Sequence, residues 1–164
     1  ILYHDVYDIP TSVLRLTNTY GPRMRIKDAR QTFLGIWIRN LLENKPIQVY
    51  GNGKQRRDYN YVDDVVDALL IAATNDEACG KIYNLGGQDS YSLEETARIM
   101  KDMVEGSSYE KIPFPRDRKA IDIGDFITDY SYFNRTFDWE PKVAFEEGMA
   151  KTIDFFRKSI KHYI

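Results

Sequence analysis

Residues 46–64 decide the fold of this chain and read PIQVYGNGKQRRDYNYVDD. A short β-type run at 47–50 predicts a strand, and the Gly51-Asn52-Gly53 triplet predicts a tight turn after it. We expect this turn to bring three cations to one place, namely Lys54, Arg56 and Arg57. Backbone amides freed by glycines, next to a planar guanidinium, suit a phosphate or diphosphate. A solvated basic turn between a strand and a helix is the alternative, and the stretch by itself does not exclude it.

The composition is that of an ordinary folded domain. The chain has 164 residues, of which 43% are hydrophobic and 29% charged, and its formal net charge is −2. This balance argues against nucleic-acid binding through an overall basic field, while local anion sites stay open. No apolar run approaches the roughly 18 residues that a membrane span needs, and metal-type spacings of His, Cys and carboxylates are absent. We therefore expect no nucleic-acid partner, no membrane partner and no metal.

Cysteine and histidine usage adds further expectations. Cys79 is the single cysteine, so no internal disulfide can form and a cytoplasmic location is favoured. A cysteine nucleophile would need a histidine partner, but His4 and His162 lie near the two ends of the chain. The chain opens at Ile1 without a methionine or a recognisable signal peptide, so we expect a domain entered partway through.

Apolar periodicity and turn residues predict alternating helices and strands. The predicted helices are a helix tail at 1–8, then 31–44, 62–74, a helix opened by a capping box of Ser92 and Glu95, 131–137 and 145–163. The predicted strands are 11–16, which reads as buried, 47–50 and 81–85. Residues 18–22 read as a break, 112–115 as extended, 116–119 as a second basic cluster, and 121–129 as a short strand and turn. This order predicts an α/β fold with parallel strand pairing.

The predicted helix at 62–74 carries two expectations. Its apolar face is expected to contain Val62, Val65, Val66, Leu69, Leu70 and Ala73. Asp63 and Asp64 fall in its first turn, where carboxylates stabilise the N-terminal end of the helix dipole. We prefer this structural role to a catalytic one for both aspartates.

A series of motifs along the chain points to one family. Residues 13–23 read VLRLTNTYGPR, residues 49–59 read VYGNGKQRRDY, and residues 61–66 read YVDDVV. YNLGG follows at 83–87, and WEP at 139–141 precedes EEG at 146–148. In this order the motifs resemble those of the extended short-chain dehydrogenase/reductases, the NAD-dependent nucleotide-sugar epimerases and dehydratases. They cover nearly the whole chain, so chance agreement is implausible.

The resemblance implies a fold class and a domain content. We expect residues 1–164 to form the C-terminal half of such an enzyme: the last parallel strands of a Rossmann-type NAD-binding sheet, interleaved with a small mixed α/β substrate-binding domain. In the family, the glycine-rich NAD loop and the catalytic Tyr-x-x-x-Lys pair precede the segment that residues 13–23 resemble, so both are expected upstream of Ile1. No Gly-x-Gly-x-x-Gly follows a strand here. The chain alone is therefore expected to hold no catalytic residue and to be inactive.

The resemblance also implies site residues. Leu16 and Thr17 match positions beside the nicotinamide ring of the cofactor NAD. Asn18 matches an asparagine that binds the substrate near its diphosphate, with a turn-forming role as the alternative. Arg57 matches the arginine that binds the diphosphate, whereas Arg56 matches a variable position and is expected to be solvated. The other expected substrate contacts are Thr32 and Phe33 at a helix start, Gln48, Val49 and Tyr50 on a strand that packs on the base, and Arg118, or else Arg116, as a second phosphate-binding arginine.

Several functions stay open within this resemblance. The favoured function is an NAD-dependent nucleotide-sugar epimerase of the UDP-glucose 4-epimerase type, with 4,6-dehydratases and UDP-glucuronate decarboxylases as alternatives. The substrate would be UDP- or dTDP-linked, and the full-length protein is expected to form a homodimer. A non-catalytic nucleotide-sugar-binding module is the alternative from a different class.

Overall fold

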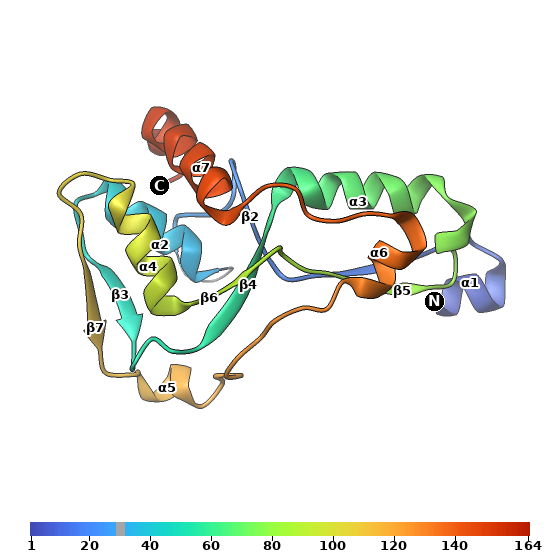
Figure 1. Ribbon diagram of the computed structural model, residues 1–164, viewed down its shortest axis with the longest axis horizontal. Coiled ribbons are helices and arrows are strands. Elements are labelled where there is room, and N and C mark those ends of the chain that lie inside the picture. The colour runs from blue at the N-terminus through green and yellow to red at the C-terminus, as the bar shows by residue number, and fades with distance from the viewer. Residues whose placement is uncertain (29–31) are drawn as a thin grey trace.

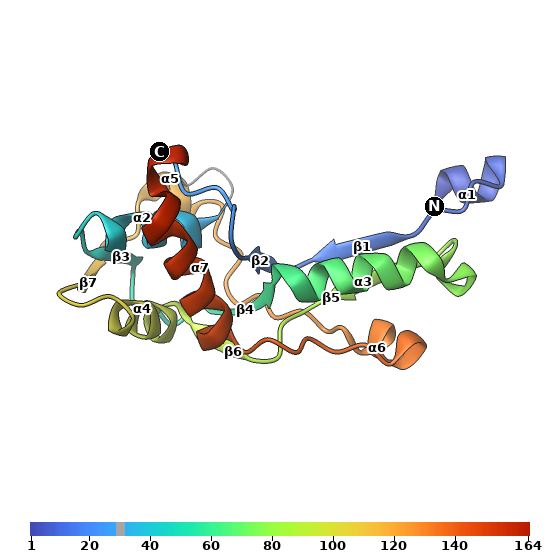
Figure 2. The same cartoon turned by 90° about the horizontal axis from the view of Figure 1, so that it is seen from above.

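The structure, a computed structural model, describes residues 1–28 and 32–164. The molecule is elongated, with α1 at one end and the helix α7 toward the other (Figures 1 and 2). In chain order, the elements of the described residues are α1 Leu2–Tyr7, β1 Val13–Leu16, β2 Asn18–Tyr20, α2 Phe33–Leu42, β3 Ile47–Tyr50, β4 Arg56–Tyr61, α3 Val62–Thr74, η1 Asp76–Ala78, β5 Ile82–Leu85, β6 Ser90–Ser92, α4 Leu93–Asp102, β7 Tyr109–Ile112, α5 Arg116–Lys119, α6 Ser131–Phe137, α7 Phe145–Ser159 and η2 Ile160–His162.

The strands form three small sheets in which parallel pairing prevails. β1 pairs with β5, and β3 pairs with β7, both in parallel. β2 runs parallel to β4, with Asn18 opposite Tyr59, and β6 adds to β4 antiparallel, with Arg57 opposite Tyr91. The predicted α/β class with parallel strands is confirmed. β4 lies at the centre, because it is the middle strand of the three-stranded sheet.

Most helix bounds agree with the sequence prediction. The strand at 47–50 and the helices at 62–74 and 131–137 begin and end where they were expected. The capping box of α4 is formed, since Ser92 Oγ accepts from the Glu95 amide at 3.1 Å and Glu95 Oε2 accepts from the Ser92 amide at 2.8 Å. Among the described helices, none has both the length and the apolar content to cross a membrane.

Four of the described strands, β2, β4, β6 and β7, lie where the sequence predicts none. Residues 18–20, read as a break, form β2, and residues 56–61 form β4. The buried positions of β4 include Asp58 and Asn60 as well as Tyr59 and Tyr61. Asp58-Tyr59-Asn60-Tyr61 does alternate between polar and aromatic residues, but only over four positions, and Asp and Asn are depleted in strands, so the stretch reads as a turn that leads into a helix.

Two apolar cores fill the two ends of the molecule. The larger core joins α2, β3, β4, α4 and α7 and includes Ile38, Met100 and Phe156. The smaller core joins α3, β5 and α6 around Tyr83 and Phe133. Strands β2 and β4 lie between the two ends (Figure 1).

The predicted burial of β1 is wrong, and of the predicted apolar face of α3 only Val65 is fully buried. Leu16, at the end of β1, is 45% exposed. The buried residues of α3 are Asp64, Val65, Ala68 and Ala72, whereas Val66, Leu69 and Leu70 are exposed. An amphipathic pattern marks a face that can be buried, but the elements that pack on it decide whether it is.

Smaller corrections concern the C-terminal loops and the first turn of α3. Residues 116–119, read only as a basic cluster, form the short helix α5. The strand expected within 121–129 is reduced to an isolated bridge between Arg57 and Phe126. Asp64 has a second structural role besides its place in the first turn of α3. Its Oδ2 accepts a hydrogen bond from the Val143 amide at 3.0 Å.

Asp58 joins three parts of the chain near the middle of the molecule. It is 1% exposed, and its carboxylate accepts hydrogen bonds from Thr17 Oγ1 at 2.6 Å and from the Gly87 amide at 3.0 Å. Its backbone carbonyl accepts from Asn18 Nδ2 at 3.0 Å. A Cβ at position 87 would lie 2.0 Å from the Tyr59 carbonyl oxygen, so this close approach requires glycine. The end of β1, β4 and the loop after β5 are thereby held together.

Asp58→Ala is expected to lower the free energy of unfolding by about 3 kcal/mol, because the charge-assisted bonds are lost and the buried Gly87 amide has no partner. Urea denaturation followed by circular dichroism measures this change. Asp138→Asn is the control: it lies at an exposed helix end with φ of 52°, a backbone that asparagine tolerates. The control should change stability by less than about 0.5 kcal/mol, and an equally small effect of Asp58→Ala would contradict its central role.

Candidate functional site

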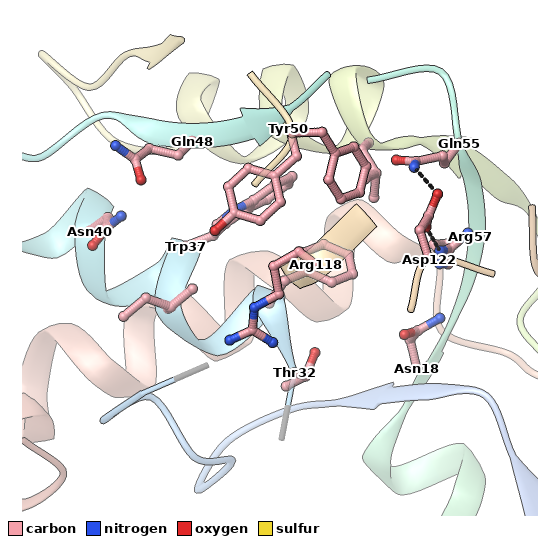
Figure 3. A pocket seen from close by; sticks show the side chains of 14 residues that line it. Asn18, Thr32, Trp37, Asn40, Gln48, Tyr50, Gln55, Arg57, Arg118 and Asp122 are labelled. Carbon is pink, nitrogen blue, oxygen red and sulfur yellow. Dashed lines mark hydrogen bonds and ion pairs between the residues drawn. The ribbon is translucent and has the colours of Figure 1, made fainter. Parts of the chain in front are cut away.

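A cavity of about 480 Å³ lies beside β3, within the size range of small-molecule sites (Figure 3). Its walls come from α2, β3, the start of β4 and α5, together with single residues of β2, of α4 and of nearby loops. The lining residues are Asn18, Thr32, Phe33, Ile36, Trp37, Asn40, Gln48, Tyr50, Gln55, Arg57, Leu93, Phe114, Arg118 and Asp122. Segments far apart in the sequence therefore build one site.

The wall formed by α2 and β3 is aromatic. The rings of Tyr50 and Phe114 have centroids 5.6 Å apart, and Trp37 lines the same part of the cavity from α2. The side-chain amides of Gln48 and Asn40 lie beyond these rings, on the side away from Arg57 (Figure 3). Flat apolar surfaces edged by amide donors and acceptors suit a planar heterocycle such as a nucleobase.

Tyr59 supports this wall from behind. Its ring centroid lies 6.4 Å from that of Phe33, and its hydroxyl shares a 2.9 Å hydrogen bond with Thr96. Burial raises the pKa of Tyr59 well above its usual value. The phenol therefore stays neutral and acts as a packed, hydrogen-bonded ring.

Arg57 lies on the opposite side of the cavity, next to Asp122 (Figure 3). Its side chain is 12% exposed, and Nη1 donates to the carbonyl oxygens of Arg56, at 2.8 Å, and Gly124. Nη2 lies 3.8 Å from Asp122 Oδ1. A guanidinium held from behind through Nη1 can present its remaining N–H groups to a planar anion, a carboxylate or a phosphate.

Arg56 and Lys54 do not join Arg57, so the prediction that the turn collects three cations is wrong. Side chains alternate along a strand, and Arg56 leaves β4 on the face opposite to Arg57. Its guanidinium donates to Ser90 and lies 3.7 Å from Glu95, while its side chain is 42% exposed, so Arg56 is solvated as expected and also engaged by protein groups. Lys54 is exposed and does not line the cavity.

Asn18 and Arg118 complete the polar lining. Asn18 Nδ2 donates one hydrogen to the Asp58 carbonyl at 3.0 Å, which leaves its second hydrogen and its Oδ1 for another partner. Arg118 is 51% exposed and extends from α5 across the cavity (Figure 3), whereas Arg116 is not among the lining residues. The structure thus brings Asn18, Arg57 and Arg118 to one cavity, and their binding roles stay predictions.

The remaining residues predicted to contact the substrate differ in whether their side chains face the cavity. Thr32 and Phe33 line the cavity at the start of α2, where Thr32 Oγ1 accepts from the Leu34 amide at 3.3 Å. Gln48 and Tyr50 line it from β3. The side chain of Val49 does not, because it is fully buried in the larger core on the other face of the strand.

Leu16 and Thr17 lie at a second, smaller cavity of about 260 Å³, which shares Asn18 and Thr32 with the first. An exposed leucine and a threonine at the end of a parallel strand fit the flat ring of a nicotinamide, as the sequence comparison implies. The sequence has no glycine-rich loop that would cradle the phosphates of a dinucleotide. The contact of Leu16 and Thr17 with the nicotinamide of NAD stays a prediction. Across the described residues, no group of three or more His, Cys, Asp or Glu could hold a metal ion.

Several lining residues are missing from the sequence prediction: Ile36, Trp37, Asn40, Gln55, Leu93, Phe114 and Asp122. The sequence contains a signal for two of them. Trp37 and Asn40 follow Phe33 by four and seven positions, so they lie on the same face of the helix as Phe33. Phe114 and Asp122 come from loops whose path the local sequence does not define.

The comparison with family models identifies the class of protein. The model of the NAD dependent epimerase/dehydratase family matches residues 1–86, more than half of the chain. This chain belongs to that family, whose members are NAD-dependent enzymes.

Relatives with different activities match the chain. It is 35% identical over 161 residues to UDP-glucuronic acid decarboxylase 1 of Xenopus tropicalis, covering 94% of this chain and 35% of that protein. It is 31% identical over 156 residues to dTDP-glucose 4,6-dehydratase of Salmonella typhimurium, covering 92% of this chain and 42% of that protein. The chain thus spans less than half the length of these curated relatives.

A comparison with solved structures supports the same family. UDP-glucose 4-epimerase of Thermotoga maritima, determined with UDP-glucose, superposes with a TM-score of 0.84 at 28% identity, covering 97% of this chain and 50% of that one. The fold is that of extended short-chain dehydrogenase/reductases, and the matched region is about half of the solved chain.

Thr32→Ala is expected to lower the free energy of unfolding by about 1 kcal/mol, because α2 loses its N-cap. Urea denaturation of the purified chain measures the loss. Thr74→Ala is the matched control, since Thr74 Oγ1 bonds only to carbonyls of its own helix at 2.8 and 3.4 Å and caps no amide. Equal stability losses in the two variants would contradict the capping role of Thr32.

Proposed function

We propose that this chain supplies the nucleotide-sugar-binding portion of an NAD-dependent nucleotide-sugar epimerase of the 4-epimerase type. The observation that carries the proposal is the cavity in which Arg57, Arg118 and Asn18 face an aromatic wall. A nucleoside diphosphate sugar has a flat base at one end and an anionic diphosphate in its middle. The cavity offers a complementary surface to each of these parts.

Binding would follow the chemistry of the two walls. The base would lie against Tyr50, Phe114 and Trp37, with Gln48 and Asn40 in reach of its edge. The diphosphate would take charge-assisted hydrogen bonds from Arg57 and a second cation from Arg118. Asn18 would place the sugar-proximal phosphate near the second cavity, which it also lines. The sugar would then be held beside Leu16 and Thr17.

The contribution of this chain to the reaction would be positioning. NAD, when bound to the whole protein, supplies hydride chemistry at the sugar. Arg57 and Asn18 would restrict the substrate to orientations in which its ring faces Leu16 and Thr17, which lowers the entropic part of the barrier. The proton-transferring Tyr-x-x-x-Lys pair is expected outside these residues, and a full-length homodimer stays a prediction.

Arg57→Gln is expected to weaken the binding of UDP by about 30-fold or more, because a charge-assisted contact to the diphosphate is lost. Isothermal titration calorimetry on the 164-residue chain measures the affinity. Arg56→Gln is the matched control, since it removes the same charge one residue away on the face of β4 that points to Ser90. It should change the affinity less than about threefold.

The proposal fails if wild-type protein does not bind UDP, or if both arginine variants bind as tightly as the wild type. Circular dichroism of each variant confirms that the fold is retained. A loss of affinity that is the same for Arg56→Gln and Arg57→Gln would assign the effect to net charge rather than to the cavity.

The reaction type is tested on a polypeptide that contains this sequence together with a glycine-rich NAD loop and a Tyr-x-x-x-Lys pair. With NAD we expect it to interconvert UDP-glucose and UDP-galactose, followed by NMR of the sugar anomeric protons. The Xenopus and Salmonella relatives favour two rivals, in which UDP-glucuronate would lose carbon dioxide or dTDP-glucose would lose water. Ligand binding without turnover of any of the three would favour a non-catalytic binding module.

A further inference from the structure

Thr17 follows β1 directly and lines the second cavity beside Asn18, which lines both cavities. The backbone amide of Thr17 donates to the Leu85 carbonyl at 3.2 Å and so continues the pairing of β1 with β5. The sheet therefore fixes the position of Thr17, and its hydroxyl is the group whose chemistry matters to a ligand in this cavity.

The hydroxyl hydrogen of Thr17 is held by Asp58. Thr17 Oγ1 donates to Asp58 Oδ1 at 2.6 Å, and the Asp58 carbonyl oxygen lies 3.3 Å from the same Oγ1. Asp58 is 1% exposed, and its Oδ2 accepts from the Gly87 amide at 3.0 Å. The carboxylate cannot turn away without leaving that buried amide unpaired, so the hydrogen of Thr17 stays directed at Asp58.

This arrangement gives Thr17 a single role toward a ligand. A hydroxyl has one hydrogen and two lone pairs. Because the hydrogen points at Asp58, Thr17 Oγ1 can offer a ligand only its lone pairs, and a bond to a carboxylate makes the oxygen a stronger acceptor. Phosphate oxygens and the oxygen of a sugar ketone have no hydrogen to donate, whereas a sugar hydroxyl has one.

The rest of the second cavity suits a sugar ring. Two of the other hydroxyls are engaged within the chain: Thr32 Oγ1 accepts from the Leu34 amide at 3.3 Å, and Thr19 Oγ1 donates to the Thr17 carbonyl at 3.4 Å. Among the described residues, those that line this cavity are all uncharged, namely Leu16, Thr17, Asn18, Thr19, Met24 and Thr32. Apolar side chains beside neutral hydrogen-bonding groups match the C–H and O–H groups of a hexose.

We propose that Thr17 is a specificity-determining residue that accepts a hydrogen bond from one hydroxyl of the sugar, and that Asp58 is the positioning residue that fixes it in this role. This inference rests on the proposed function, because the diphosphate has to lie at Arg57 and Asn18 for the sugar to reach the second cavity. A sugar that lacks this hydroxyl, or has a ketone in its place, leaves Thr17 Oγ1 without a donor. The site therefore selects a hexose with the hydroxyl intact over its deoxy or keto analogue.

The first test compares the affinities of UDP and UDP-glucose for the 164-residue chain, measured by calorimetry. Thr17→Val keeps the shape of the side chain without the acceptor. It should weaken UDP-glucose about tenfold and change UDP less than about twofold, because UDP carries no hexose. Thr17→Ser restores the hydroxyl and should recover most of the UDP-glucose affinity. Thr74→Val is the matched control, since it removes a hydroxyl that bonds only within its own helix.

The second test needs no variant for its first step. Analogues of UDP-glucose in which one hydroxyl at a time is replaced by fluorine, which cannot donate, are titrated into the wild-type chain. At least one analogue should bind about tenfold more weakly than UDP-glucose. This penalty should disappear in Thr17→Val, because the acceptor for the missing hydrogen is already gone.

Asp58→Asn tests the positioning role. The oxygen of the asparagine amide has to accept from the Gly87 amide, so its Nδ2 faces Thr17 and donates. The hydrogen of Thr17 is then free to point to the ligand. We expect the ratio of the affinities for UDP-glucose and the penalised analogue to fall from about tenfold to about one. A merely structural role of Asp58 would lower both affinities and leave their ratio unchanged, which would refute the positioning role.

The remaining outcomes separate the inference from the proposed function. If the wild type binds UDP but gains no affinity from the glucose unit, the inference fails and the proposed function stands. The same holds if Thr17→Val weakens UDP and UDP-glucose equally or weakens neither, if Thr17→Ser binds UDP-glucose as weakly as Thr17→Val, or if the fluorine penalty persists in Thr17→Val. If the wild type binds neither UDP nor UDP-glucose, the proposed function and the inference fail together.

Discussion

The buried carboxylate of Asp58 is the constraint on which the arrangement of this chain depends. A carboxylate that is 1% exposed has to be satisfied inside the protein, and its partners are Thr17 Oγ1 and the Gly87 amide. These two groups lie at the ends of β1 and β5, which pair with each other and not with β4. Asp58 therefore ties the two-stranded sheet to the central sheet. The same residue holds Asn18 through its carbonyl and so positions one side of the cavity.

β4, the strand that carries Asp58, also directs Arg56 and Arg57 to opposite faces. Because side chains alternate along β4, Arg56 points to Ser90 and Glu95, whereas Arg57 points to the cavity and to Asp122. Two adjacent arginines thus have separate tasks: one ties β4 to β6 and α4, and the other is available to a ligand. The charge that faces the cavity is in turn balanced by Asp122, so the free protein does not leave an unpaired cation in a partly buried site.

Much of the fold followed from local patterns, and the misses have two different causes. The predicted bounds of α3 and α6 and the Ser92–Glu95 capping box agree with the structure, although α3 and α6 have no side-chain N-cap. β4 was missed because its alternation covers only residues 58–61 and its polar positions are Asp and Asn, which are depleted in strands. The exposure of Leu16 and of Leu70 was missed for a different reason. Apolar character predicts the capacity to be buried, but only packing between distant elements shows whether a layer covers the residue.

The sequence by itself determined the family, the α/β class and the residue types that gather at the cavity, because motif spacing and local propensity are properties of neighbouring residues. It placed Asn18, Arg57, Tyr50 and Arg118 among the candidates. The tertiary structure decided which face each of them occupies and what else meets them there. Val49 is removed from the cavity by the pleat of β3, and Asp122 reaches Gln55 across 67 positions of sequence. Contacts of this kind depend on the path of the whole backbone, which no local pattern encodes.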